Sequence, residues 1–183
     1  ILSDQFLAEV RGLKHKNVAA ELMAKLLKGE IKIRSLRNLV QSRAFSKMLT
    51  NTLNAYHNRA IATHEVIEEL IKLAKEMDAA TKRGEDLGLN EDEIAFYDAL
   101  AANESAVKAM GNDELKVIAA ELVTQVRKNV TIDWAVRESA RARIKVMVKR
   151  ILKKHGFPPD LQDEATKTVL AQAELLSAMW AVE

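Results

Sequence analysis

Hydrophobic positions recur at helical intervals along most of the chain. Between Glu30 and Arg83 there is no Gly or Pro, and apolar or small residues step by alternating four and three, which is the heptad spacing of a helix that packs on its neighbours. The pattern predicts one long helix from about 41 to about 81. Its seam comprises Leu49, Leu53, Tyr56, Ala60, Thr63, Ile67, Leu70, Ala74 and Met77.

Shorter helices are predicted on either side of this segment. Val18, Leu22 and Leu26 repeat at i+4 and predict a buried stripe. Asn90 with Glu93 three residues later forms a capping box that opens another helix. No segment alternates apolar and polar residues as a half-buried strand would. We therefore predict an all-α fold without a sheet, in which residues 1–183 form one helical domain.

A further helix is predicted after Asp133, which is placed to cap it, and Gly156 and Pro158 should end it. Trp134 is expected to bury the helix entrance. One sector of the helical wheel is apolar and should face the core. Its members are Val136, Ala140, Ile144, Met147, Val148 and Ile151.

Composition supports a helical, globular chain of one domain's size. Among 183 residues, 48% are hydrophobic and 30% charged, with only 6 Gly and 2 Pro. The chain has no Cys, which fits a reducing cytoplasm. No apolar run is long enough for a membrane span, and the first residues lack the features of a signal peptide. Because the sequence starts at Ile1 rather than Met, we expect a piece of a longer polypeptide.

The charge is unevenly distributed although the total is only +2. The stretch from Arg127 to His155 carries ten Lys or Arg and two acids, whereas the rest has 18 cations and 24 acids. This basic helix, residues 134–155, predicts a surface for phosphates or an acidic protein. A solvated or internally paired face remains the alternative. The candidate contact residues are Arg141, Arg143, Lys145, Lys149, Arg150 and Lys153.

The sequence offers no catalytic constellation. Phosphate-binding loops and GxSxG are absent, and without Cys there is no thiol nucleophile. The stretch HEVIEEL, from His64, lacks the second His of the HExxH zinc motif. We therefore predict no catalytic, cofactor-binding or metal-binding residue in these 183 residues.

Several phrases together resemble the C-terminal region of the restriction (R) subunit of type I restriction–modification enzymes. The resemblance runs from about Leu13 to Leu176 and depends on the order and spacing of the phrases. They are GLKHKNVAAELMAKLLKGEIKIRSLRNLVQSRAFSKML, YHNRAIATHEVIEELIKLAKEM, RGEDLGLNEDEIAFYDALA, NESAVKAM and VRKNVTIDWAVRESARARIKVMVKRILKKHGFPPD.

The resemblance implies a parent subunit that is an ATP-dependent DNA translocase and endonuclease. ATP and Mg²⁺ would belong to nuclease and motor domains outside these residues. The helical region would help to attach the subunit to the methyltransferase and specificity subunits, in the cytoplasm. Two rival classes remain open: a helical module that binds double-stranded DNA phosphates sequence-nonspecifically through residues 134–155, and a metal-dependent helix-bundle enzyme.

Overall fold

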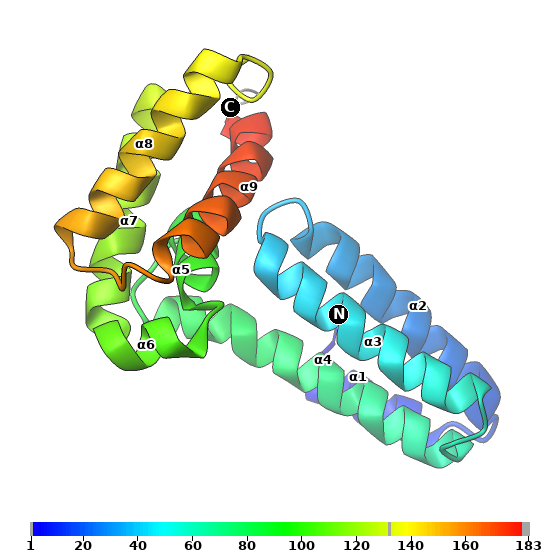
Figure 1. The fold of residues 1–183 in the computed structure, drawn as a ribbon. Coiled ribbons are helices and arrows are strands. Elements are labelled where there is room, and N and C mark those ends of the chain that lie inside the picture. The colour runs from blue at the N-terminus through cyan, green and yellow to red at the C-terminus, as the bar shows by residue number, and fades with distance from the viewer. Residues whose placement is uncertain (1, 132, 181–183) are drawn as a thin grey trace. The chain divides into compact units, whose positions relative to one another are not determined.

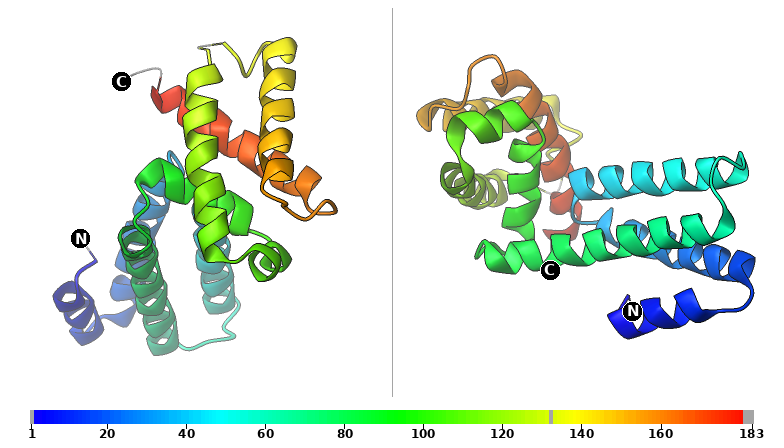
Figure 2. Two further views of the ribbon diagram at one scale, coloured as in Figure 1. Left: turned by 90° about the vertical axis from the view of Figure 1, so that its left-hand side faces the viewer. Right: turned by 90° about the horizontal axis from the view of Figure 1, so that it is seen from below.

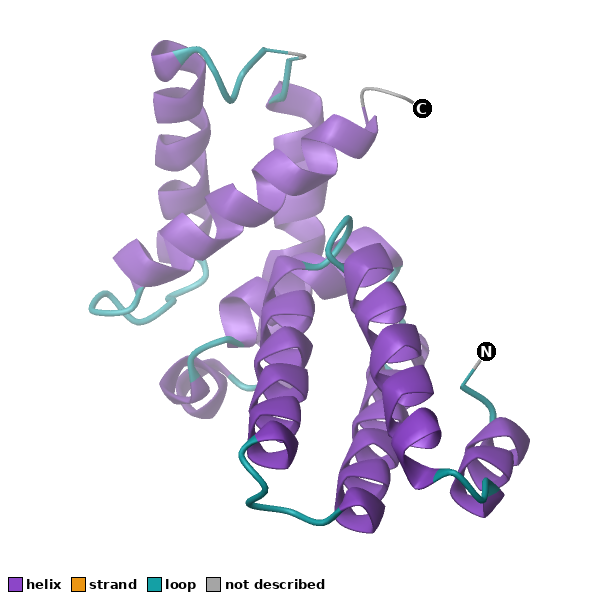
Figure 3. Ribbon diagram, turned by 90° about the vertical axis from the view of Figure 1, so that its right-hand side faces the viewer, coloured by secondary structure: helices purple, strands orange, loops and turns teal. Residues whose placement is uncertain are grey.

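The computed structural model describes residues 2–131 and 133–180. Within these ranges the chain forms nine α-helices and no strand, as the ribbons of Figures 1 and 3 show. The predicted all-α fold is confirmed.

The helices divide into two compact units, and neither unit is continuous in sequence. Unit 1 contains the chain up to Ser35 and Gln41–Leu87. Unit 2 contains the short segment Leu36–Val40 and the chain from Gly88 onward.

Unit 1 is built from α1 (Asp4–Gly12), α2 (Lys16–Arg34), α3 (Leu39–His57) and α4 (Thr63–Asp86). The first two residues of α3, Leu39 and Val40, belong to unit 2. Helices α2, α3 and α4 are long, with roughly aligned axes (Figures 1 and 2). All four contribute to one apolar core. Its largest contributor is α4, with Val66, Ile67, Leu70, Ile71, Leu73, Ala74 and Met77.

The predicted helix over 41–81 is wrong in one respect, because α3 ends at His57 and α4 begins at Thr63. Arg59 takes a left-handed conformation with φ 57°. Its N–H donates to Tyr56 O, and the next N–H, of Ala60, donates to Ala55 O. This is the Schellman pattern that ends helices, usually with Gly at the left-handed position. Here a non-Gly residue occupies it, so no Gly or Pro marks the break.

The apolar stripe predicted on α2 is also wrong. Val18 is 60% exposed, whereas Ala19, Met23 and Leu27 are buried in the core of unit 1. Both rows have the same i+4 spacing, so periodicity could not choose between them. Ala20 is buried as well, and its small side chain allows α2 to pack closely on α4.

Unit 2 contains α5 (Glu91–Ala101), α6 (Glu104–Met110), α7 (Asn112–Asn129), α8 (Glu138–Lys154) and α9 (Gln162–Trp180). Helices α7 and α8 run side by side and α9 crosses them obliquely (Figures 1 and 2). The N-terminus of α5 carries the predicted capping box, in which Asn90 and Glu93 exchange hydrogen bonds.

The linking segment, Leu36–Val40, is held inside unit 2 by buried polar side chains. Gln172 on α9 accepts a hydrogen bond from the Leu39 N–H at 2.9 Å and donates one to the Arg37 carbonyl at 2.6 Å. Asn38 donates to Asp98 on α5 at 2.7 Å, and both side chains are buried. Five residues far from α5 and α9 in sequence are therefore an integral part of unit 2.

Candidate functional site

The basic helix is α8, and it begins later than the sequence predicted. Its first residue is Glu138, and Asp133 lies in the preceding turn, where its backbone carbonyl accepts from Val136 and Arg137. Val136, predicted to be buried, is 89% exposed. Because the chain is not yet helical at Val136, the helical wheel wrongly placed its side chain on the buried side of the helix.

Trp134 lies in this turn and is 1% exposed, which confirms that it buries the entrance to the helix. Beyond it, α8 packs into unit 2 through Ile144, Val148, Ile151 and Leu152. The first three belong to the predicted apolar sector. Leu152 was not included in that sector.

One flank of α8 is paired with α9. Arg141 forms an ion pair with Glu174, and Lys149 Nζ lies 2.6 Å from Asp163 Oδ1. The hydrogen bond from Lys149 lowers the pKa of Asp163, and the nearby charge of Lys145 acts in the same direction. Lys145 is exposed and forms no ion pair among the described residues, so only Arg141 and Lys149 are held by carboxylates of their own chain. The acids that hold them lie outside the basic stretch, so local charge counting could not find them.

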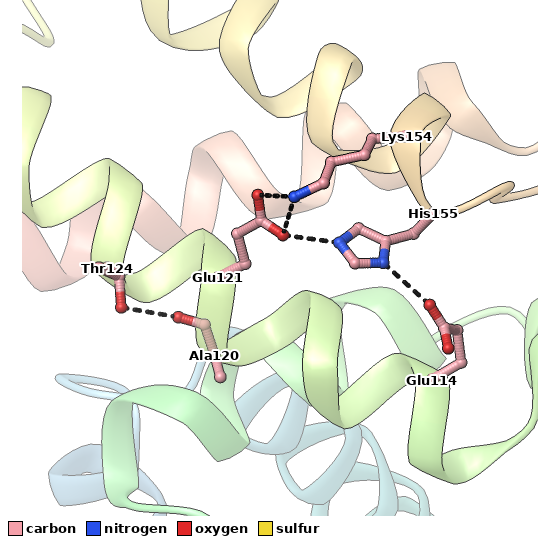
Figure 4. A network of polar contacts seen from close by, with 6 residues as sticks. All are labelled: Glu114, Ala120, Glu121, Thr124, Lys154 and His155. Atoms are coloured by element: carbon pink, nitrogen blue, oxygen red, sulfur yellow. Dashed lines mark hydrogen bonds and ion pairs between the residues drawn. The ribbon is translucent and has the colours of Figure 1, made fainter.

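The C-terminus of α8 is fastened to α7 by a charged cluster (Figure 4). His155 Nδ1 is 2.9 Å from Glu114 and Nε2 is 2.6 Å from Glu121. Lys154 Nζ also contacts both oxygens of Glu121, at 2.9 and 3.1 Å. The hydrogen bond to Glu121 is the main cause of a raised His155 pKa, and the bonds from His155 and Lys154 lower the pKa of Glu121.

The cluster predicts a pH-dependent contribution to stability. A raised folded-state pKa means that His155 stabilises fully below its unfolded pKa, near 6.5, and loses this contribution as the pH rises through the folded value. We expect His155→Gln to lower the free energy of unfolding by about 1–3 kcal/mol below pH ~6, and by progressively less as the pH rises through the raised folded-state pKa. Denaturant titrations across this pH range measure the difference.

His64→Gln is the matched control, because His64 is exposed on α4 and makes none of these contacts. Its effect should be small at every pH. A cost for His155→Gln that does not change with pH would show that the imidazolium form is not what fastens α8.

The side of α8 opposite the buried residues forms an outer face, defined here as Arg143, Val146, Arg150 and Lys153. All four side chains are exposed, and Val146 is 66% exposed. Its three cations make no ion pair with any acid among the described residues. Of the six predicted contact residues, two are thus paired (Arg141 and Lys149), Lys145 is exposed beside them, and three lie on the outer face (Arg143, Arg150 and Lys153). An exposed Val among cations was the signal that the sequence reading missed.

The described residues contain no cluster of three or more His, Asp or Glu side chains placed to hold a metal ion. They also contain no helix long and apolar enough to cross a membrane. The outer face of α8 presents three positive charges around one small apolar side chain, that of Val146. Such a surface is suited to an anionic partner.

Comparison with known proteins identifies the class to which these helices belong. The chain is a member of the family described as "Type I restriction enzyme HindI endonuclease subunit-like, C-terminal", and the match covers residues 1–179. It therefore belongs to the C-terminal region of type I restriction enzyme endonuclease subunits, as the sequence resemblance indicated.

Two particular relatives are similar over most of the chain. The Type I restriction enzyme HindI endonuclease subunit of Haemophilus influenzae is 40% identical over 174 residues, which is 95% of this chain and 16% of the relative. The putative type I restriction enzyme MjaIXP endonuclease subunit of Methanocaldococcus jannaschii is 32% identical over 158 residues, covering 86% of this chain and 15% of the relative. The chain thus spans about a sixth of each relative's length. No solved structure matches it.

Proposed function

We propose that this chain is the assembly region of a type I restriction enzyme subunit, and that it helps to attach the DNA-cleaving, ATP-dependent translocating subunit to the methyltransferase–specificity core. Family membership supports the first part, since both relatives are named as endonuclease subunits. The absence of a phosphate loop in the sequence supports a non-catalytic role. ATP and Mg²⁺ would act elsewhere in the subunit, in the cytoplasm.

The observation that carries the docking role is the outer face of α8. Three sets of contacts hold α8 in place: buried Trp134 before its start, ion pairs to α9 along one flank, and the His155 cluster at its C-terminus. A rigid helix with its remaining cations turned outward is a prepared surface, because little conformational entropy is lost when a partner covers it. Ion pairs within the chain account for four other cations of the basic stretch, namely Arg137, Arg141, Lys149 and Lys154.

The composition of this face favours a protein partner over DNA. Val146 stands among the cations and is 66% exposed, and apolar contacts and Arg are both enriched in the buried centres of protein interfaces. Phosphate contacts would gain nothing from Val146. Duplex DNA bound through the basic helix 134–155 remains the alternative function.

Charge reversal on the outer face tests the proposal. We expect Arg143→Glu with Arg150→Glu to weaken co-purification with a tagged methyltransferase–specificity complex by about tenfold or more, because like charges replace attractive ones at a docked surface. Lys108→Glu with Lys128→Glu, at exposed positions of α6 and α7, changes the net charge equally and should leave co-purification intact.

Wild-type co-purification by the Arg143 and Arg150 variant would contradict docking through α8. If that variant assembled normally but bound duplex DNA less tightly than the control, the DNA-binding alternative would be favoured. Circular dichroism must show unchanged helix content in both variants.

A further inference from the structure

A second basic surface lies in unit 1, on a groove between α2 and α3 that has a volume of about 800 Å³. Four Lys or Arg and one His line it, and no Asp or Glu does. The lining residues with charged or titratable side chains are Lys28, Lys32, Arg43, Lys47 and His57.

The groove's Lys and Arg side chains are exposed and available. Lys28 and Lys32 come from α2, and Arg43 and Lys47 from α3. None of the four makes an ion pair with an acid in the described part of the chain. In this they differ from Arg141 and Lys149 on α8, which are paired with acids of α9. Their charges must be balanced by solvent ions or by a ligand.

Helix α3 itself has the side chains of a phosphate-contacting surface. It contains no acid in its 19 residues. Its groove-lining exposed positions carry hydrogen-bond donors, namely Arg43, Ser46, Lys47, Thr50, Asn51 and Asn54. Arg, Lys, Ser, Thr and Asn are the residues that contact phosphate and sugar in protein–DNA complexes.

The dimensions of this row suit a polyanion rather than a single phosphate. Arg43 and Asn54 are eleven residues apart, which is roughly 16 Å along a helix at about 1.5 Å per residue. Measured along the duplex axis, that length corresponds to about five base-pair steps at ~3.4 Å per step. One face of α3 is therefore long enough to contact more than one phosphate.

We propose that the α2–α3 groove binds the phosphate backbone of duplex DNA without reading its sequence. The four Lys and Arg side chains supply the attraction, and no acid in the lining opposes it. No Phe, Tyr or Trp lines the groove, so the side chains on which single-stranded bases usually stack are missing there. This site is separate from the outer face of α8 and does not depend on the proposed docking of that helix.

An acidic protein segment is the competing ligand, and the groove walls favour DNA. Three apolar residues line the groove: Ile31 and Leu49 are buried in the core of unit 1, and Leu53 is partly buried against it. The exposed lining residues are Lys, Arg, Ser, Thr, Asn and His. A docked protein helix would need apolar contacts, and Leu53 is the only partly exposed apolar residue that the described lining offers.

Binding of a short fluorescein-labelled duplex to the 183-residue chain, followed by anisotropy, tests the proposal. Wild-type affinity should fall with salt along a log–log slope of about −3, as expected when three or four phosphates are neutralised. Arg43→Glu with Lys47→Glu should weaken binding by about tenfold or more at low salt and make the slope shallower.

The matched control is Lys72→Glu with Lys75→Glu, at exposed positions on α4 and outside the groove. It changes the charge of unit 1 by the same amount and should cost little affinity. Equal losses in the two variants would overturn the groove as the site, and so would unchanged binding by the Arg43 and Lys47 variant. Circular dichroism shows whether each variant is folded.

Two further probes separate the ligand classes. Polyglutamate that binds the wild-type chain as tightly as the duplex, and loses affinity in the Arg43 and Lys47 variant, would replace the DNA proposal with an acidic protein partner. A single strand that binds more tightly than the duplex would overturn the assignment to duplex DNA. Preference for the duplex over both probes is the result expected.

Discussion

Trp134→Ala should lower the free energy of unfolding of unit 2 by about 3–5 kcal/mol, the usual cost of removing a buried aromatic side chain. Trp134 heads the largest fully buried side chains of the described chain. It lies in the turn between α7 and α8, where its backbone N–H donates to the Thr131 carbonyl. Truncation would leave a cavity beneath the start of α8. Urea denaturation followed by far-UV circular dichroism measures the loss.

Trp134→Phe is the informative comparison for this prediction. The indole Nε1 is buried without a hydrogen-bond partner among the described residues, so phenylalanine sacrifices volume but no hydrogen bond. It should cost clearly less than alanine. A phenylalanine variant as unstable as the alanine variant would mean that the indole N–H, rather than the ring's bulk, stabilises the turn.

Gln172→Leu should lower the free energy of unfolding by about 2–4 kcal/mol. Leucine has a similar size but can neither accept from the Leu39 N–H nor donate to the Arg37 carbonyl. Each backbone group left unsatisfied in a buried setting costs roughly 1–3 kcal/mol. Gln172 is itself fully buried, so water cannot replace the lost contacts at its position. Urea denaturation of the two proteins measures the difference.

Gln125→Leu provides the control for this substitution. Gln125 lies partly buried on α7 and its side chain has no hydrogen-bond partner among the described residues. The same chemical change there should have little effect. Equal costs at both positions would show that the linking segment does not depend on the hydrogen bonds of Gln172.

Helix type could be predicted from the sequence, but two boundaries could not. Heptad spacing continues through Ala60 and Thr63, so the break after His57 is invisible to periodicity. It depends on Arg59 adopting a left-handed conformation that normally calls for Gly. Likewise Asp133 is a good capping residue, yet the chain forms a turn there because Trp134 is drawn into the core. In both places tertiary packing decided what local preference left open.

The candidate site was predicted in part. The charge of α8 was evident from the sequence, but which cations are available depends on Glu174 and Asp163, which lie on α9. Conversely, the groove cations on α2 and α3 escaped notice because they come from two helices and are interspersed with apolar residues. Counting charge along one helix finds a basic helix. It does not find a basic groove shared by two.

The linking segment has a consequence for how this chain can be divided. A polypeptide started at Gly88 would contain α5 to α9 but would lack residues 36–40, so Gln172 and Asp98 would each lose a buried partner. A fragment that ends at Leu87 would contain residues 36–40 but lack their partners on α5 and α9. Gene truncations placed between α4 and α5 should therefore yield unstable halves. During synthesis, residues 36–40 cannot form their hydrogen bonds with Gln172 until α9 has left the ribosome.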